Sequence, residues 1–144
     1  IVHLCGPRYE AEVRAMYGEL PPQVTLRPYE DRMGLAYAAA DLVVCRAGSS
    51  TLAELSAVGR ASLLVPSPNV TENHQEENAR GLEEVGAAEV LVEPGWDLDA
   101  AVARVLALAS DPDRLRQMGE AARAQARLDA AQRAADVVES LLPR

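Results

Sequence analysis

Residues 41–55, "DLVVCRAGSSTLAEL", place a strand-like apolar run directly before a hydroxyl-rich turn and a helical pattern. The run ends at Cys45, and Arg46 separates it from the cluster that begins at Gly48. Leu52 and Leu55 then recur at a spacing of three residues, which is typical of one buried helix face. The stretch therefore predicts a strand, a short turn and a helix, the unit from which parallel α/β sheets are built.

The same unit recurs along the first two thirds of the chain. Gly59 and Gly86 stand where a helix should end before the next strand, as glycine often does in a left-handed conformation. Repetition of strand and helix predicts a parallel sheet with right-handed crossovers and flanking helices. The expected strands are 1–5, 24–28, 41–45, 61–66 and 88–92, and the expected helices between them are 8–20, 31–40, 51–58 and 75–85.

After residue 96 the strand-like runs cease, and the pattern is helical to the end. The one expected break is "SDPD" (110–113), where Ser110 or Asp111 can cap a new helix that has Pro112 at its first position. We expect a single domain over 1–144, made of an α/β part (1–96) and a helical tail (97–144).

Composition excludes several classes of protein. The chain has 144 residues, 49% of them hydrophobic, so it can bury a sizeable core. A formal net charge of −8 argues against a general nucleic-acid surface, which needs a basic face. Cys5 and Cys45 end apolar runs and are expected to be free thiols in a reducing compartment. The sequence has no zinc-site spacing and no apolar run long enough to span a membrane, and we expect neither a metal nor a cofactor.

The turn after residue 45 is a candidate anion site, because ligands of open parallel sheets bind beyond the carboxyl ends of the strands. Arg46 offers a positive charge, and Gly48 permits a ligand to approach the backbone closely. Ser49, Ser50 and Thr51 stand where the amides of a helix start attract a phosphate. Two alternatives concern Glu54.

In the first alternative, Thr51 and Glu54 form a T-x-x-E capping box that satisfies the helix start without a ligand. In the second, the Glu54 carboxylate accepts hydrogen bonds from two ribose hydroxyls, a role that acids have in nucleotide sites of this architecture. The pattern of residues leaves both alternatives open.

The next junction, "LLVPSPNVTENHQEENA" (63–79), repeats the geometry. Asn73 is a plausible helix cap with Glu76 three residues later, which fits a capped helix start. His74, Gln75 and Asn78 would then stand at the start of the helix, on the carboxyl edge of the sheet. A lone histidine is more often a surface or capping residue than a catalyst, and this set of amides suits sugar hydroxyls better than a metal.

These two junctions, with "HLCG" (3–6) and "YEDRMGLAYAAADLVV" (29–44), closely resemble the carboxyl-terminal domain of the MurG family. That family comprises GT-B transferases that use UDP-N-acetylglucosamine (UDP-GlcNAc) in peptidoglycan synthesis. The resemblance covers essentially the whole chain and implies a Rossmann-like parallel sheet with flanking helices. It also implies a role for each candidate residue: Glu54 on the ribose; Arg46, Gly48, Ser49, Ser50 and Thr51 on the diphosphate; His74, Gln75 and Asn78 on the sugar; and Tyr29 and Met33 near the uracil. Some relatives carry glutamine at the place of His74, which implies hydrogen bonding rather than proton transfer.

The implied activity is transfer of N-acetylglucosamine from UDP-GlcNAc to lipid I with inversion, which gives lipid II. The resemblance places the catalytic base, the acceptor site and a membrane-facing patch in an amino-terminal domain outside these residues. We therefore expect no catalytic residue here, no transfer by this chain alone, and peripheral attachment of the full-length enzyme to the cytoplasmic side of the bacterial inner membrane.

The resemblance also implies that an earlier strand belongs between the strands at 1–5 and 41–45. We expect its place to appear as a gap, as pairing with another molecule, or as a rearranged sheet that brings those two strands together. An unfilled place would expose unpaired strand edges.

Two other functions fit the residues. One is another GT-B transferase that uses a UDP-sugar and a lipid or glycan acceptor, including two-subunit types. The other is a nucleotide-binding or regulatory module without transferase activity, in which the helix-start motifs serve only packing. Binding of UDP and UDP-GlcNAc, compared with ADP, distinguishes these functions.

Overall fold

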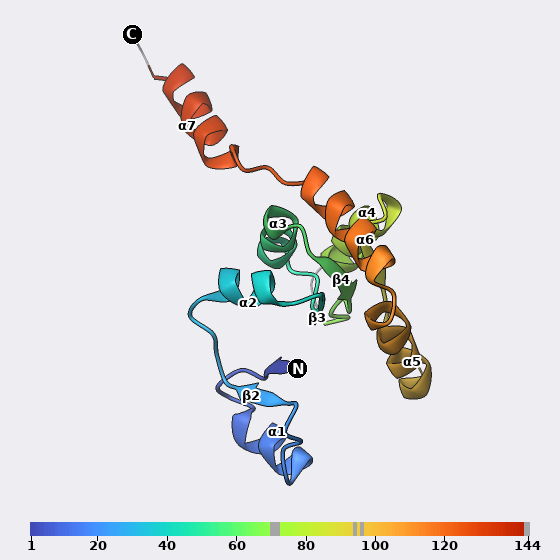
Figure 1. Ribbon diagram of the computed structural model, residues 1–144. Coiled ribbons are helices and arrows are strands. Elements are labelled where there is room, and N and C mark those ends of the chain that lie inside the picture. Colours follow the sequence, from blue (N-terminus) through green and yellow to red (C-terminus); the bar gives the residue numbers. More distant parts are fainter. Residues whose placement is uncertain (70–72, 94, 96, 143–144) are drawn as a thin grey trace. The chain divides into compact units, whose positions relative to one another are not determined.

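The computed structural model describes residues 1–69, 73–93, 95 and 97–142 (Figure 1). The chain divides into two compact units, residues 1–36 and residues 37–144.

The first unit contains a two-stranded parallel sheet and one helix. Strand β1 (Val2–Leu4) pairs with β2 (Thr25–Arg27), and helix α1 (Glu10–Tyr17) connects them. Two acidic residues in the first turn of α1 are favourable beside the positive end of the helix dipole. Helix α2 (Met33–Ala39) begins in this unit and continues into the second.

The second unit is built on a three-stranded parallel sheet in the order β3–β4–β5. Strand β3 (Leu42–Cys45) and strand β5 (Ala88–Val90) both pair with β4 (Ala61–Leu64). All four residues of β4 are buried, so the strand shows no alternation of apolar and charged residues, and its single polar residue is the small Ser62. The carboxyl ends of the three strands meet at one edge, which we call the carboxyl edge.

Five helices complete this unit. Helix α3 (Ser49–Val58) connects β3 to β4, and α4 (His74–Glu84) connects β4 to β5. The tail forms α5 (Leu98–Ala109), α6 (Pro112–Ala124) and α7 (Ala130–Ser140). A core cluster joins the sheet to the tail through Ala61, Leu63, Leu108 and Met118. The tail helices α5 and α6 are thus part of the packing of the domain, whereas every residue of α7 is exposed.

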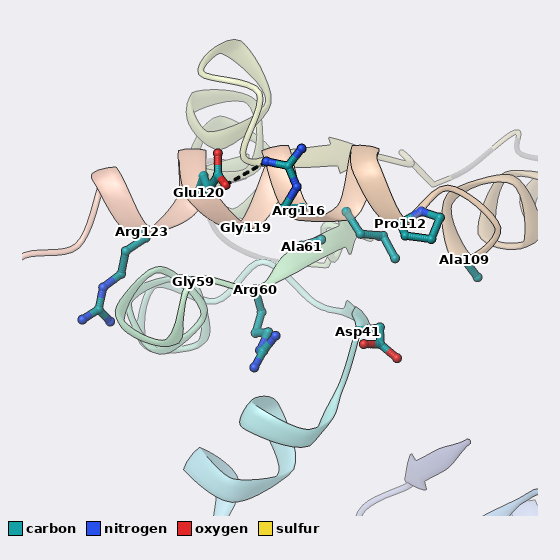
Figure 2. Close-up of a pocket in the computed structure, with 11 residues that line it drawn as sticks. Asp41, Gly59, Arg60, Ala61, Ala109, Pro112, Arg116, Gly119, Glu120 and Arg123 are labelled. Carbon is teal, nitrogen blue, oxygen red and sulfur yellow. Dashed lines mark hydrogen bonds and ion pairs between the residues drawn. The ribbon is translucent and has the colours of Figure 1, made fainter.

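Helices α3 and α6 approach each other through two glycines. Gly59 ends α3 in the left-handed conformation (φ 71°), as the sequence predicts. Figure 2 shows Gly119 of α6 over this turn, and a Cβ atom built on Gly119 would lie 2.7 Å from the carbonyl oxygen of Gly59. That separation is too short for a side chain, so the crossing requires glycine at position 119.

The predicted class of fold is confirmed, since every expected strand forms and all pairs are parallel. Asp111 caps α6 as expected, accepting a hydrogen bond from the Arg114 amide, with Pro112 at the first helical position. The prediction of one uninterrupted helix after residue 113 is wrong, because α6 ends at Ala124 and α7 starts only at Ala130. The proposed boundary at residue 96 lies outside the described residues.

Strands β1 and β3 belong to separate sheets, and no strand within the described ranges pairs with both. Of the three outcomes expected for that place in the sheet, the rearranged sheet that pairs β1 with β3 is therefore wrong for the described residues. Val44 of β3 is half exposed, and it lines an apolar cavity with residues of α5.

Candidate functional site

Arg46 lies at the carboxyl edge and joins the segments that follow all three strands. Its Nη1 atom donates to the carbonyl oxygens of Val65 and Pro66, both at 3.2 Å, and lies 2.9 Å from Oε2 of Glu93. The guanidinium is therefore already engaged within the chain, although its side chain remains 53% exposed. Its charge is partly offset by Glu93.

The start of α3 follows β3 after only three residues and has no side-chain cap. Gly48 is the N-cap, and its carbonyl oxygen accepts from the Leu52 amide, which leaves the amides of residues 49–51 without an intrahelical partner. The capping-box alternative is wrong, because Thr51 lies in the first turn of the helix rather than at the N-cap.

Neither the backbone angles of Gly48 nor its contacts with described residues require glycine at this position. Its φ of −67° suits any residue, and a Cβ atom there would meet only Oγ1 of Thr51, at 4.0 Å. Open space beside the uncapped amides permits a ligand to approach the backbone, which is the geometry of an anion site at a helix N-terminus.

Glu54 lies one turn further along α3, close to a buried tyrosine of α2. Burial raises the pKa of Tyr37 to about 12, with further contributions from the charge of Glu54 and a hydrogen bond to it, while a hydrogen bond with Thr51 acts in the opposite direction. The Tyr37 hydroxyl thus lies near the Glu54 carboxylate. Because Glu54 is exposed, the rest of its carboxylate can accept from a ligand.

The loop after β4 is held by Gln75 of α4. The side-chain oxygen of Gln75 accepts a hydrogen bond of 3.0 Å from the Ser67 amide, and Ser67 Oγ accepts one from the Asn69 amide at 3.4 Å. Gln75 therefore supports the loop through its oxygen, and its amide nitrogen is the part that can serve a sugar hydroxyl.

Asn73 is the N-cap of α4, as expected, but it does not cap the helix in the expected way. Its side chain accepts no bond from the helix; it donates to Glu76 Oε2 at 2.8 Å. Asn73 has φ 54°, the only positive value at a non-glycine residue in the described ranges. Such backbone strain is found preferentially at ligand sites. His74 and Asn78 are both exposed in the first turns of this helix.

Tyr29 and Met33 belong to the first unit, so their place relative to the carboxyl edge stays a prediction. Tyr29 is 67% exposed, and Met33 begins α2. Between them, Glu30 forms an ion pair with Arg27 at 2.5 Å and accepts from the Arg32 amide. That backbone hydrogen bond is the main reason that the pKa of Glu30 is lowered.

Two cavities of the second unit lie away from these residues. One, of about 620 Å³, lies at the amino ends of the strands, where Asp41 precedes β3 and Arg60 precedes β4 (Figure 2). Among the arginines that line this cavity, Arg116 forms an ion pair with Glu120. The other, of about 270 Å³, is wholly apolar and lies between the sheet and α5. Neither is lined by a candidate residue.

Sequence reasoning missed three residues that support the site: Tyr37, Ser67 and Glu93. Glu93 follows a strand at the same edge as Arg46, so the rule that located the two junctions could also have indicated it. Ser67 lies within the second junction and could have been indicated in the same way, whereas Tyr37 gave no such signal because its contact depends on the tertiary arrangement.

No helix in the described ranges has the length and apolar character that a membrane crossing requires. Nor do their His, Cys, Asp and Glu residues form a group of three or more that could hold a metal ion. The thiols of Cys5 and Cys45 are free, and burial raises the pKa of Cys45 to about 11.

A parallel sheet with flanking helices and an uncapped helix start at its carboxyl edge places the chain in the class of open α/β domains, which bind ligands at that edge. In a comparison with protein families, residues 1–134 match the glycosyltransferase family 28 C-terminal domain. The chain belongs to this family.

Its resemblance to MurG enzymes is also confirmed. The chain is 51% identical over 126 residues to the UDP-N-acetylglucosamine–N-acetylmuramyl-(pentapeptide) pyrophosphoryl-undecaprenol N-acetylglucosamine transferase of Symbiobacterium thermophilum, which covers 85% of this chain and 34% of that protein. It is 48% identical to the same transferase of Salinibacter ruber, covering 100% of this chain and 38% of that protein. The crystal structure of Acinetobacter baumannii MurG matches with a TM-score of 0.86 and 29% identity, over 98% of this chain and 41% of that chain. The chain thus spans a little over a third of the length of the relatives that it matches.

Proposed function

We propose that this chain is the UDP-GlcNAc-binding domain of an inverting glycosyltransferase that converts lipid I into lipid II. The observation that carries the proposal is the uncapped start of α3 beside Arg46, at the same sheet edge as the Gln75 loop. Family membership gives the class of reaction, and the open edge supplies groups for each part of the donor.

Each part of the donor has a matching group. The diphosphate accepts from the amides of residues 49–51 and from Arg46, and Gly48 leaves room for it. The ribose hydroxyls donate to Glu54. The sugar is bound by Gln75, Asn78 and His74, and the uracil packs near Tyr29 and Met33.

The reaction is a direct displacement. A hydroxyl oxygen of lipid I forms a bond to C1 of the sugar, the bond from C1 to the phosphate oxygen breaks, and a base outside this chain takes the hydroxyl proton. Negative charge grows on the departing UDP, and the helix-start amides and Arg46 stabilise it. This chain's part is therefore binding and leaving-group stabilisation.

The proposal also concerns the domain as a whole and the longer protein to which it belongs. The 144 residues act as one donor-binding domain. The acceptor lipid I and the membrane surface are met by another part of the longer protein, which attaches peripherally to the cytoplasmic side of the bacterial inner membrane. Alone, the chain binds the donor without transferring the sugar.

Calorimetric titration of the chain with UDP-GlcNAc, UDP and ADP tests the proposal. We expect both uridine nucleotides to bind and ADP to bind more weakly, and no lipid II to form when lipid I is added. Equal binding of ADP would favour a general nucleotide module, and the absence of binding would contradict the proposed function.

A further inference from the structure

Glu93 is the residue that fixes the position of the Arg46 guanidinium. Arg46 follows β3, the two carbonyl groups that it contacts follow β4, and Glu93 follows β5. All three contacts use one nitrogen, Nη1, which has only two N–H groups to share among three acceptors. The Nη1 end of the planar guanidinium is thus held in place at the carboxyl edge of the sheet.

The opposite part of the guanidinium stays available. Among the described residues, none hydrogen-bonds to Nε or Nη2 of Arg46, and the side chain is 53% exposed. Arginine carries five donors in a rigid fork, so anchoring one corner fixes the direction of the others. These donors belong to the same short turn as the uncapped amides at the start of α3.

We propose that Glu93 is a positioning residue of the donor site, which acts through Arg46 on the diphosphate. The inference rests on the proposed function. Glu93 holds the guanidinium corner beside the carbonyl groups of Val65 and Pro66, so the remaining N–H groups are presented to an anionic group. Exposed ion pairs contribute little to stability, so the effect concerns orientation rather than folding.

Charge alone predicts the opposite effect of a substitution. The Glu93 carboxylate lies 2.9 Å from Nη1, and its negative charge repels a nearby diphosphate. If Glu93 acted only through its charge, Glu93→Gln would tighten the binding of UDP. If it orients Arg46, Glu93→Gln weakens binding even though a repulsive charge has been removed. The sign of the change therefore separates the two roles.

The first test is calorimetric titration of Glu93→Gln with UDP. We expect affinity to fall roughly two- to fivefold, the size of effect of an exposed ion pair. Glu84→Gln is the matched control, because Glu84 is an exposed acid at the end of α4 and the substitution changes the net charge equally. Unchanged or tighter binding by Glu93→Gln would overturn the proposal.

The substitution Arg46→Lys tests whether the Nε and Nη2 donors of Arg46 contribute to binding, separately from the contacts of Nη1. A lysine ammonium can replace Nη1 at its three acceptors but supplies nothing in place of Nε and Nη2. We expect Arg46→Lys to lose UDP affinity while its unfolding midpoint in urea stays near that of the unsubstituted chain. Full retention of affinity would show that the free donors bind no diphosphate, which contradicts the proposal.

The last readout needs no ligand and keeps this inference distinct from the proposed function. We expect the NMR order parameter of Arg46 Nε to fall in Glu93→Gln and to stay unchanged in Glu84→Gln. An unchanged value in Glu93→Gln would overturn the positioning role. Failure of the unsubstituted chain to bind UDP would instead contradict the proposed function, whatever the order parameter shows.

Discussion

Glu54 is the residue on which nucleotide recognition depends most directly in this account. Its carboxylate is exposed on α3 and lies near the Tyr37 hydroxyl, so it can accept hydrogen bonds from a ligand. The structure also removes its alternative role, since Thr51 is not the N-cap of this helix.

Glu54→Ala should therefore weaken UDP binding by about 1–3 kcal/mol, because the ribose hydroxyls lose a charged acceptor. Calorimetry with UDP and 2′-deoxy-UDP measures this, and the preference for UDP should shrink in the variant. Glu139→Ala, an exposed acid of α7, serves as the control. Undiminished UDP affinity in a folded Glu54→Ala chain would remove Glu54 from the site.

Gln75 has two functions that two substitutions can separate. Its oxygen supports the Ser67 amide, and its nitrogen is proposed to serve the sugar. Gln75→Glu keeps the acceptor but loses the donor, whereas Gln75→Ala loses both. We expect both variants to weaken binding of UDP-GlcNAc more than binding of UDP in parallel titrations. If Gln75→Ala weakened the binding of both ligands equally and Gln75→Glu weakened the binding of neither, Gln75 would only support the loop.

Tyr37 gives the stability of the fold a dependence on high pH. Its pKa is raised from an ordinary value of 10.0 to about 12, so the folded state keeps the phenol protonated where the unfolded state releases the proton. This contribution is complete below pH 10.0 and is lost as the pH rises towards 12. It amounts to at most about 3 kcal/mol.

We expect the free energy of unfolding in urea to decline less between pH 9 and pH 11 in Tyr37→Phe than in the unsubstituted chain. Cys45, whose pKa is raised by burial to about 11, titrates in both proteins, and only its charge interaction with Tyr37 differs between them. Parallel pH curves for the two proteins would contradict the interpretation.

At the scale of elements, the crossing of α3 and α6 holds the site helix on the sheet. Gly119 lies inside α6, and a Cβ atom there would lie 2.7 Å from the carbonyl oxygen of Gly59 at the end of α3 (Figure 2). Both α3 and α6 pack close to the sheet there, and the atom in the way is backbone, which cannot rotate aside. A displacement of α6 would therefore be transmitted to the helix that carries Glu54.

Gly119→Ala should lower the free energy of unfolding by about 1–3 kcal/mol because of this overlap. Gly81→Ala is the matched control: Gly81 is also inside a helix, but a Cβ atom there meets nothing within 4 Å. That control should be neutral or stabilising by up to about 1 kcal/mol, given the higher helix propensity of alanine. Urea unfolding of both variants measures the difference, and equal stabilities would contradict the role of the crossing.

The elements were predictable where local rules decide them. Apolar periodicity located every strand, Gly59 marked a helix end, and Asp111 with Pro112 marked a helix start. The separation of α6 from α7 carries no proline or glycine at the break, so the alanine-rich pattern gave no warning. The start of α3 was placed two residues late because Thr51 and Glu54 imitate a capping box.

At the scale of the whole molecule, the candidate site could be located from the sequence but its internal contacts could not. Parallel topology alone brings the ends of β3 and β4 to one edge, which is why both junctions were found. The ion pair of Arg46 with Glu93 joins residues 47 positions apart, and no local pattern encodes such a pair. The two units are separate sheets, so the uracil contacts proposed for the first unit remain open to experiment.

We propose that a uridine diphosphate sugar binds at the carboxyl edge of β3 and β4. Titration of the labelled chain with UDP-GlcNAc, followed in amide ¹H–¹⁵N NMR spectra, tests it residue by residue. We predict that shift changes concentrate in residues 46–54 and in the described part of 66–78, and that ADP produces smaller changes there. Changes centred instead on Gly59, Arg60 and Arg116, around the cavity at the amino ends of the strands, or no changes at all, would contradict the account.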